Sequence, residues 1–501
     1  MGNIVIIGGG VAGLSAGIYA RMRGYNAIIV EKHNILGGNL TGWNRNGYHI
    51  DNCVHWLVGT NKNDYLYKIW EDIGALGNVD IYQSEAFYTY ENGGVRLSAS
   101  KDIKKFRADL LAIAPEDEKQ INWLIKAIKA IQGYYGVGGE NHDEKDGVFK
   151  MLKSVPIVLK CYNMTIGDLA KKFKNEVIRG FLKCLFTERF SALVILFFLA
   201  LYMGGDAALP SGGSVAMAQR IGERFLSLGG KMLLGKEVSE ICVDKKLAYA
   251  VKTKDGVTIP ADAVVVACDP KVVFGKMIDI PMPKQLQKMY DDEKLCTFSS
   301  TQCAFACEKK DLPFSGEVIF DLSETESIEL CAESLFVKEF SYEKSFAPEG
   351  STVLQTMVFF KEDVSEKYIK LRENDREEYK KQKKNIAKTV VSALERYYVG
   401  LKDKLKLLDV WTPATYKRYT NSQSGAYMTF GFSKKVAPIR KSNRVKGVKN
   451  MVLATQWIQA LGGLPIAAEC GKIAIKTIEK LKIVKKAVTA KGLRAVTDFN
   501  V

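Results

Sequence analysis

Histidine is scarce in this 501-residue chain, which contains only four, and its ten cysteines are scattered. They include no zinc-type pair of pairs, and Cys303 and Cys307, four positions apart, have no histidine near them. No Ser-His-Asp set and no paired-carboxylate site stands out. The sequence therefore predicts no metal site, and it predicts free, mostly buried thiols of the kind found in a reducing cytoplasm.

A long hydrophobic run is also missing. The most apolar run, Ala192–Met203, has 12 residues, and Lys183, Glu188 and Arg189 stand just before it. Spanning a bilayer takes about 20 residues, so the run is either a buried helix of a large domain or part of a substrate tunnel or membrane-dipping element. No basic segment precedes the first apolar run, and no signal peptide is expected. The predicted location is the cytoplasm, with peripheral attachment to the inner face of the membrane as a further option.

Acidic residues are too few to balance the basic ones. The chain has 56 Asp and Glu against 72 Lys and Arg, a formal net charge of +16. Such an excess favours anionic partners: phosphate cofactors, an anionic membrane surface or nucleic acid. No compact nucleic-acid motif occurs, so no nucleic-acid partner is predicted. The C-terminal region is rich in lysine and is either a lipid-contacting or a merely solvated tail. Its lysines are Lys472, Lys476, Lys480, Lys482, Lys485 and Lys486.

What the chain does have begins at residue 4. The apolar segment Ile4–Ile7 predicts a buried parallel strand, and Gly8, Gly10 and Gly13 follow it in the spacing G-x-G-x-x-G. These glycines permit a tight turn, a close approach to a pyrophosphate, and close packing of helix on strand, while the helix N-terminus favours an anion. The next strand ends at Glu31, at the position expected for a carboxylate that binds a ribose hydroxyl. The sequence therefore predicts a dinucleotide site.

The residues after Glu31 distinguish flavin from nicotinamide. Lys32 is followed by Gly37, Gly38 and Asn39. An acid, about five residues and then Gly-Gly resembles the flavoprotein superfamily of amine oxidases and phytoene desaturases, whose second glycine turn passes the FAD pyrophosphate. That superfamily usually has arginine where this chain has Asn39, so phosphate binding would rest on backbone amides and the Asn39 amide.

Further segments continue the resemblance in the same order along the chain. Gly47–Asp51 is similar to the superfamily's hairpin, Pro210–Ser214 to its Pro-x-Gly-Gly turn, and Gly462–Pro465 to the segment that closes over the flavin. The likeness is nearest to the bacterial phytoene-desaturase and retinol-saturase branch. The residues that the resemblance assigns to FAD binding are Gly8, Gly10, Val11, Ala12, Gly13, Glu31, Lys32, Gly37, Gly38, Asn39, Val238, Gln456, Gly463, Leu464 and Pro465.

The resemblance implies an α/β fold. It predicts a Rossmann-type FAD-binding domain of the GDI-like, amine-oxidase type, with an inserted mixed α+β substrate domain. The expected FAD-binding domain is discontinuous and comprises residues 1–75, 210–275 and 445–484. The expected substrate domain comprises residues 76–209 and 276–444, and a basic tail covers residues 485–501.

The implied function is an FAD-dependent oxidoreductase of the phytoene desaturase type. It would desaturate or saturate C–C bonds of a long apolar unsaturated substrate by hydride transfer to or from flavin N5. The alternatives are a flavin-dependent double-bond isomerase on a similar lipid, an amine oxidase, and a non-catalytic GDI-like binder of prenylated proteins. His55 and Tyr427 are the candidate catalytic residues, although a core histidine and an ordinary buried aromatic explain them as well.

Local patterns predict several further elements. We expect a hairpin over residues 82–98 and helix over residues 103–135 with a break near Pro115. We also expect a polar loop over residues 136–147 and one charged helix over residues 365–398.

Overall fold

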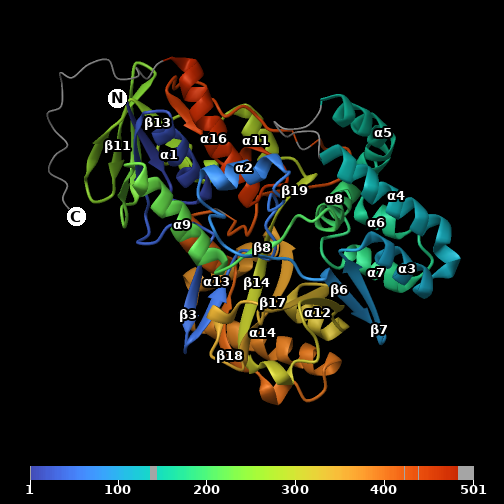
Figure 1. The fold of residues 1–501 in the computed structure, drawn as a ribbon. Coiled ribbons are helices and arrows are strands. Elements are labelled where there is room, and N and C mark those ends of the chain that lie inside the picture. Colours follow the sequence, from blue (N-terminus) through green and yellow to red (C-terminus); the bar gives the residue numbers. More distant parts are fainter. Residues whose placement is uncertain (1, 136–143, 423, 438, 483–501) are drawn as a thin grey trace.

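The computed structural model describes residues 2–135, 144–422, 424–437 and 439–482. Three parts are distinguishable in Figure 1: a parallel sheet with α1 and α16, a larger sheet with α14, and a lobe of helices that includes α4 and α5. The parallel sheet and the helical lobe lie at opposite sides of the molecule. The site described below lies where the three parts meet.

The described part of the chain forms a five-stranded sheet in the order β20-β13-β1-β2-β9, with every neighbouring pair parallel. Ile4–Ile7 of its central strand are apolar and buried on both faces, as the sequence predicted. The strands are β1 (Asn3–Ile7), β2 (Asn26–Val30), β9 (Lys231–Leu233), β13 (Ala263–Val266) and β20 (Met451–Leu453).

Three long helices pack beside this sheet: α1 (Val11–Met22), α9 (Gly213–Ser227) and α16 (Leu464–Leu481). Helix α1 contacts both α9 and α16, and its residues 11–20 are all buried. The strands and helices of this part come from three distant stretches of the chain, all within the segments that the sequence analysis assigns to the FAD-binding domain. The exact domain bounds stay a prediction.

Smaller elements complete this part. An antiparallel sheet lies beside it and is built from β10 (Val238–Asp244), β11 (Leu247–Thr253) and β12 (Thr258–Pro260). The other short elements are β3 (Gly42–Arg45), β4 (Tyr48–Asp51), α2 (Tyr65–Asp72), β5 (Ile81–Tyr82), β8 (Leu209–Pro210), α10 (Pro270–Val273) and α11 (Lys284–Tyr290).

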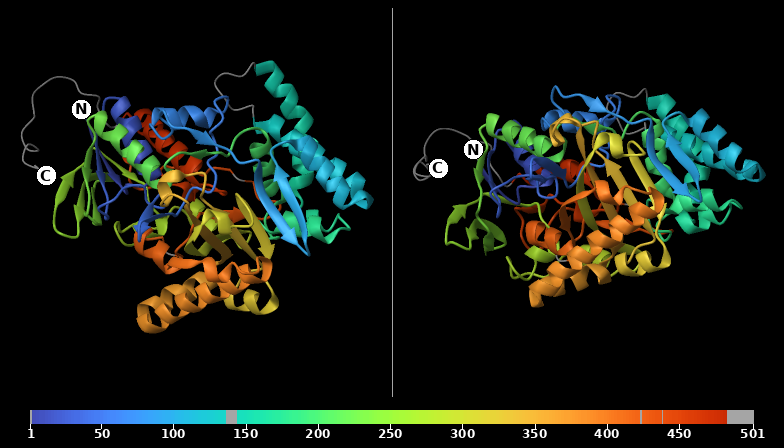
Figure 2. Two further views of the ribbon diagram at one scale, coloured as in Figure 1. Left: turned by 60° about the horizontal axis from the view of Figure 1, so that its bottom comes forward. Right: turned by 90° about the horizontal axis from the view of Figure 1, so that it is seen from below.

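A larger mixed sheet in the order β18-β14-β17-β16-β15-β6-β7 forms the second part, and β19 pairs with β14. Strands β15 and β6 pair in parallel and join the two stretches expected to form the substrate domain. Figure 2 shows α13 and α14 along this sheet. The elements are β6 (Ala86–Asn92), β7 (Val95–Ser100), β14 (Leu295–Glu308), β15 (Glu317–Asp321), α12 (Glu324–Leu330), β16 (Ser334–Glu339), β17 (Ser351–Lys361), α13 (Glu362–Asn374), α14 (Arg376–Tyr397), β18 (Lys406–Trp411), α15 (Pro413–Thr420) and β19 (Phe430–Phe432).

The third part, the helical lobe, comprises residues 103–135 and 144–203. Its helices are α3 (Ile103–Ile113), α4 (Glu118–Tyr135), α5 (Glu144–Tyr162), α6 (Ile166–Ala170), α7 (Glu176–Lys183) and α8 (Ala192–Met203). Helix α8 begins after Ser191, whose side chain accepts the N–H of Leu193, and it is apolar on every face. Such a helix belongs in a protein interior, and most of its residues are buried. No described helix is long and apolar enough to cross a bilayer.

The expected hairpin and the helix break near Pro115 are confirmed, because β6 and β7 flank Gly93 and Gly94, and a short 3-10 turn at Pro115 separates α3 from α4. Two expectations were wrong. Residues 365–398 form two helices, because Asp375 leaves the helical conformation and caps α14 by accepting the N–H of Glu378. Residues 144–147 belong to α5, while residues 136–143 of the expected loop lie outside the described residues.

Candidate active site

One cavity of about 700 Å³ runs between the three parts of the molecule. At one end, it is lined by the turn between β1 and α1 and by the residues that follow β2 and β13. At the other end, its wall is apolar and comes from the helical lobe and the larger sheet. The apolar arm, as we call this second part, is lined by Trp56, Ile131, Val158, Tyr162, Phe186, Leu193, Phe197, Phe198, Phe298, Met357 and Phe359.

The glycine turn leaves the N-terminus of α1 open toward the cavity. Gly8 has φ +106°, and a Cβ on Gly13 would lie 1.9 Å from the Gly8 carbonyl oxygen, so α1 can approach β1 only because Gly13 has no side chain. Gly10 precedes α1 and supplies no capping side chain, and Gly10, Val11 and Ala12 line the cavity. A helix N-terminus of this kind suits an anionic group such as a phosphate.

Glu31 stands at the carboxyl end of β2, beside the glycine turn. Its carboxylate accepts the Gly9 N–H at 2.7 Å and the His33 N–H at 2.8 Å, one on each oxygen. Each oxygen keeps a further acceptor position toward the cavity that Glu31 lines. The two backbone donors fix the carboxylate where a ribose hydroxyl would have to meet it.

Lys32 and Asn39 line the same end of the cavity, and both have protein partners. The Lys32 ammonium donates to the Arg418 carbonyl and to the Asn421 side chain, each at 2.7 Å, and burial lowers the pKa of Lys32. The Asn39 amide donates to the Tyr427 carbonyl at 3.1 Å. One hydrogen of the Asn39 amide is therefore bonded to Tyr427. Asn39 follows Gly37 and Gly38 where the superfamily usually has an arginine, so the guanidinium that would bind phosphate is missing at this position.

The predicted flavin-closing segment also lines the cavity. The Gln456 side-chain oxygen accepts the Gly463 N–H at 2.6 Å, and Gly463 has φ +131°, a conformation that favours glycine. Helix α16 then begins at Leu464, with Pro465 in its first turn, where a missing N–H costs nothing. Val238, at the start of β10, lies on the wall near the glycine turn. All the predicted cofactor residues except Gly13 therefore line this one cavity. Gly13 instead lies against the Gly8 carbonyl.

His55 and Tyr427 both lie on the cavity wall. The His55 Nδ1 is buried and has no hydrogen-bond partner within the described residues. Burial, and then the charge of Lys338, hold the pKa of His55 well below its usual range, so its imidazole is neutral. The Tyr427 hydroxyl donates to the Cys53 carbonyl at 3.0 Å, and burial raises the pKa of Tyr427 well above its usual value. Both candidates are therefore uncharged at neutral pH.

An ion pair behind His55 was missed by the sequence reasoning. Lys338 is buried and Glu317 is half-buried, with 2.7 Å between Nζ and Oε1, and Lys338 also donates to the His55 carbonyl at 2.9 Å. Burial raises the pKa of Glu317, and Lys338 opposes that shift. The only local signal was a lysine in the apolar strand segment Ser334–Glu339, and nothing in the sequence linked it to His55.

Comparison with known proteins places the chain in a family. Residues 11–474 match the family described as flavin containing amine oxidoreductase, and the chain belongs to it. FAD is its cofactor, and it is an FAD-dependent oxidoreductase. The α/β fold of the amine-oxidase and GDI-like type is confirmed.

Individual relatives are distant. The chain is 23% identical over 451 residues to prolycopene isomerase 2, chloroplastic, of an Oncidium hybrid cultivar, covering 85% of this chain and 75% of the relative. It is 23% identical over 506 residues to the 1-hydroxycarotenoid 3,4-desaturase of a Flavobacterium species, covering 95% and 99%. The solved structure of putrescine oxidase with putrescine bound has a TM-score of 0.61 at 16% identity, covering 95% of this chain and 99% of the other, which shows a shared fold.

We predict that Glu31→Ala weakens FAD binding on the order of tenfold to a hundredfold. The change removes an acceptor for the ribose hydroxyls, and a hydrogen bond to a charged group contributes roughly 1.5–3 kcal/mol. The loss of affinity is measured by titrating apoprotein with FAD and by the fraction of flavin that the protein retains after desalting. Glu31→Gln keeps one side-chain oxygen and serves as the matched control, with a smaller expected effect. Equal retention by wild type and Glu31→Ala would show that Glu31 does not bind the ribose.

We also predict that FAD is bound non-covalently. Two thiols line the cavity, Cys53 and Cys268, and burial raises the pKa of both, that of Cys268 to about 12. A thiol with such a pKa is protonated at neutral pH and is a poor nucleophile toward a flavin. Acid precipitation of the purified protein should leave the yellow colour in the supernatant. A yellow pellet would contradict the prediction.

Proposed function

We propose that the chain desaturates or saturates C–C bonds of a long, apolar, unsaturated substrate. The observation that carries the proposal is the apolar arm of the cavity, which is lined by Leu193 and Phe197 of α8 together with the aromatic residues Phe298 and Phe359. Such a wall matches a hydrocarbon chain and offers little to a polar or charged substrate. The names of the carotenoid-acting relatives support the same substrate class.

The cofactor would be held by the residues already described. We propose that the open N-terminus of α1 faces the pyrophosphate, that Glu31 binds the ribose, and that Gly463 and the start of α16 lie against the flavin ring. When bound, FAD supplies the redox chemistry by accepting or donating a hydride at N5. The surrounding residues fit this group, because Gly10 and Gly38 leave room for close approach and the helix ends direct N–H groups into the cavity.

The protein's own side chains would position the substrate and exclude water. Transfer of a long hydrocarbon into water is unfavourable by about 0.8 kcal/mol per CH₂. An apolar arm keeps the bound chain out of water and so avoids this unfavourable free energy. The neutral imidazole of His55, whose Nδ1 has no hydrogen-bond partner among the described residues, is a weak base on the cavity wall. Proton loss from a delocalised polyene cation needs only a weak base, and we propose that His55 accepts this proton.

Two alternatives use the same site. A double-bond isomerase, as in the prolycopene isomerase relative, would act on the same kind of substrate without net redox change. An amine oxidase is disfavoured by charge: the carboxylates that line the cavity in the described residues are Glu31, Glu237 and Asp269. These acids lie at the glycine-turn end, so the apolar arm offers no counter-ion for a cationic amine. For a GDI-like prenyl-protein binder, the complete glycine and Glu31 set has no evident use.

We predict that Phe197→Asp lowers turnover at least ~tenfold while FAD binding is kept. A carboxylate on the wall of the apolar arm must be desolvated when a hydrocarbon binds, and that desolvation is unfavourable. Phe197→Leu keeps the wall apolar and is the control. The measurement is anaerobic flavin reduction or reoxidation with a panel of unsaturated lipids and quinones, with product analysis to separate isomerisation from redox change. Reduction by small polar amines, with no response to any lipid, would replace the proposal by amine oxidation.

We predict that His55→Phe lowers kcat roughly a hundredfold or more, the usual contribution of a positioned base, without loss of FAD. Because the pKa of His55 lies well below its usual range, the wild-type kcat should show no histidine ionisation between pH 6 and pH 8. His55→Gln, which retains an acceptor, should recover part of the activity. A kcat unchanged in His55→Phe would leave His55 as a packing residue.

A further inference from the structure

Helix α5 carries apolar side chains on its solvent side. Leu152, Val155 and Leu159 are 59%, 36% and 57% exposed, and their spacing puts them on one face of the helix. Ser154, Ile157 and Cys161 are buried, and α5 packs against α4 and α8. Figures 1 and 2 show α5 at the outer edge of the helical lobe in every view. The outer face of α5, defined by Leu152, Val155 and Leu159, is thus an apolar stripe without a cover in this chain's described residues.

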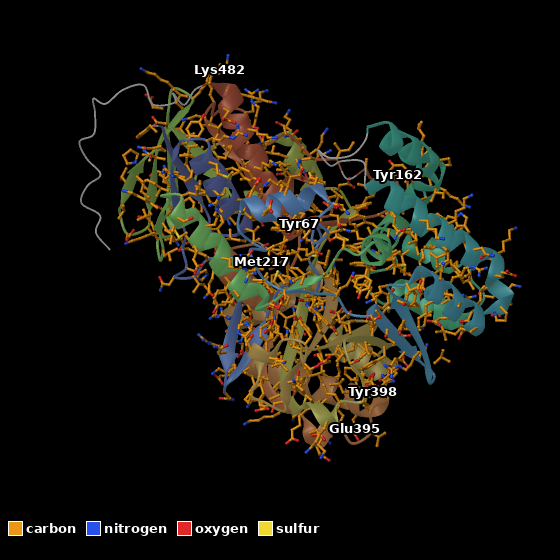
Figure 3. All side chains as sticks on the ribbon, viewed as in Figure 1. Tyr67, Tyr162, Met217, Glu395, Tyr398 and Lys482 are labelled. Carbon is orange, nitrogen blue, oxygen red and sulfur yellow. The ribbon has the colours of Figure 1, made fainter. Side chains whose placement is uncertain are left out.

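The apolar arm of the cavity reaches the surface beside this stripe. Val158 and Tyr162, on the same helix, line the arm and are partly exposed, and Figure 3 labels Tyr162 on α5. The Lys435 N–H donates to the Tyr162 carbonyl at 2.8 Å. Two residues further on, Ala437 both lines the cavity and is exposed, and Ile439 is 65% exposed. The mouth of the arm is therefore bordered by Val158, Tyr162 and Ala437.

Three lysines lie on the elements that border this mouth or next to them, and the Lys160 ammonium lies over the Trp123 ring of α4, 4.8 Å from its centroid. Lys160 and Lys172 both lie close to the Cys161 thiol, where their charges oppose the rise in its pKa caused by burial. Lys435 is exposed at the other border of the mouth. None of these three lysines forms a salt bridge with another described residue, whereas the nearby Lys434 is paired with Asp168 at 2.7 Å. The rim of the mouth therefore carries uncompensated positive charge next to exposed apolar side chains.

We propose that the outer face of α5, together with Ile439, docks on the surface of an anionic lipid bilayer and holds the mouth of the apolar arm in the interface. An apolar helix face flanked by lysines is the pattern of an interfacial helix. A second copy of the chain or a protein partner seated there would cover the mouth. A bilayer instead supplies the apolar continuity that a hydrocarbon needs on its way into the arm. The proposal rests on the proposed substrate class.

This docking surface differs from the lysine-rich C-terminal region, for which the sequence left both a lipid contact and a merely solvated tail open. Lys482 lies at the outer end of α16, in the part of the molecule that contains the parallel sheet, and Tyr162 lies in the helical lobe (Figure 3). The tail over residues 485–501 lies outside the described residues. The face that borders the cavity mouth is therefore on α5.

Flotation of the FAD-loaded protein with phosphatidylcholine vesicles, with and without phosphatidylglycerol, tests the proposal. We expect binding that needs phosphatidylglycerol and weakens with salt, by roughly fivefold for each lysine near the surface. The double variant Leu152→Ser, Leu159→Ser should bind at least ~tenfold more weakly, because two leucines no longer enter the interface. The control, Leu226→Ser with Ile328→Ser, changes two residues that are 53% and 71% exposed on α9 and α12 and should bind like wild type.

Turnover separates this proposal from the proposed function. With substrate in detergent, both double variants should match wild type; with substrate in vesicles, only the α5 variant should be slow. No turnover of any lipid by any form, together with vesicle binding lost only in the α5 variant, would remove the substrate proposal and keep the docking face. Equal vesicle binding by wild type and the α5 variant would overturn the docking proposal. So would sedimentation that shows a wild-type dimer converted to monomer by the α5 substitutions, which would assign the face to a second copy.

Discussion

The close approach of α1 to β1 is the constraint on which the rest of the structure depends. A Cβ on Gly13 would lie 1.9 Å from the Gly8 carbonyl oxygen, so the helix starts directly over the end of the strand. This contact points the free N–H groups of the first turn into the cavity and places Glu31, one strand away, at its edge. Because α1 also packs between α9 and α16, its position sets those of the helices contributed by distant segments.

A second buried group links those segments around the cavity. The Asp51 carboxylate accepts the N–H groups of Cys53 and Ser214 at 3.0 and 2.6 Å, and Gln355 donates to the Asp51 carbonyl at 2.7 Å. One residue at the end of β4 thus joins the start of α9 and a strand of the larger sheet. Loss of this buried carboxylate would leave the backbone N–H groups of Cys53 and Ser214 without their acceptor.

Charge is distributed in the site in a way that agrees with its two expected occupants. Acids, lysines and open N–H groups border the end that suits a dinucleotide, whereas the apolar arm is lined by hydrocarbon and aromatic side chains. The two titratable candidates beside the arm, His55 and Tyr427, are neutral because burial opposes their ionisation. The ion pair of Lys338 with Glu317 lies behind His55, and Lys338 bonds to the His55 carbonyl. The described side chains that line the apolar arm therefore carry no charge.

The sequence by itself determined the cofactor, the fold class and the apolar helix, because each is encoded locally. Gly8, Gly10, Gly13 and Glu31 lie within one strand–helix–strand unit, and the apolar run Ala192–Met203 is a helix with those same bounds. Only the tertiary structure decided the shape of the cavity, which side chains share its wall, and where its mouth lies, because these depend on segments hundreds of residues apart. The bond from Lys338 to His55 spans 283 positions, and the bond from Lys435 to Tyr162 at the end of α5 spans a similar separation. Side-chain periodicity describes which residues are buried, but it contains no information on which distant residue they meet, since that is set by how the three parts pack together.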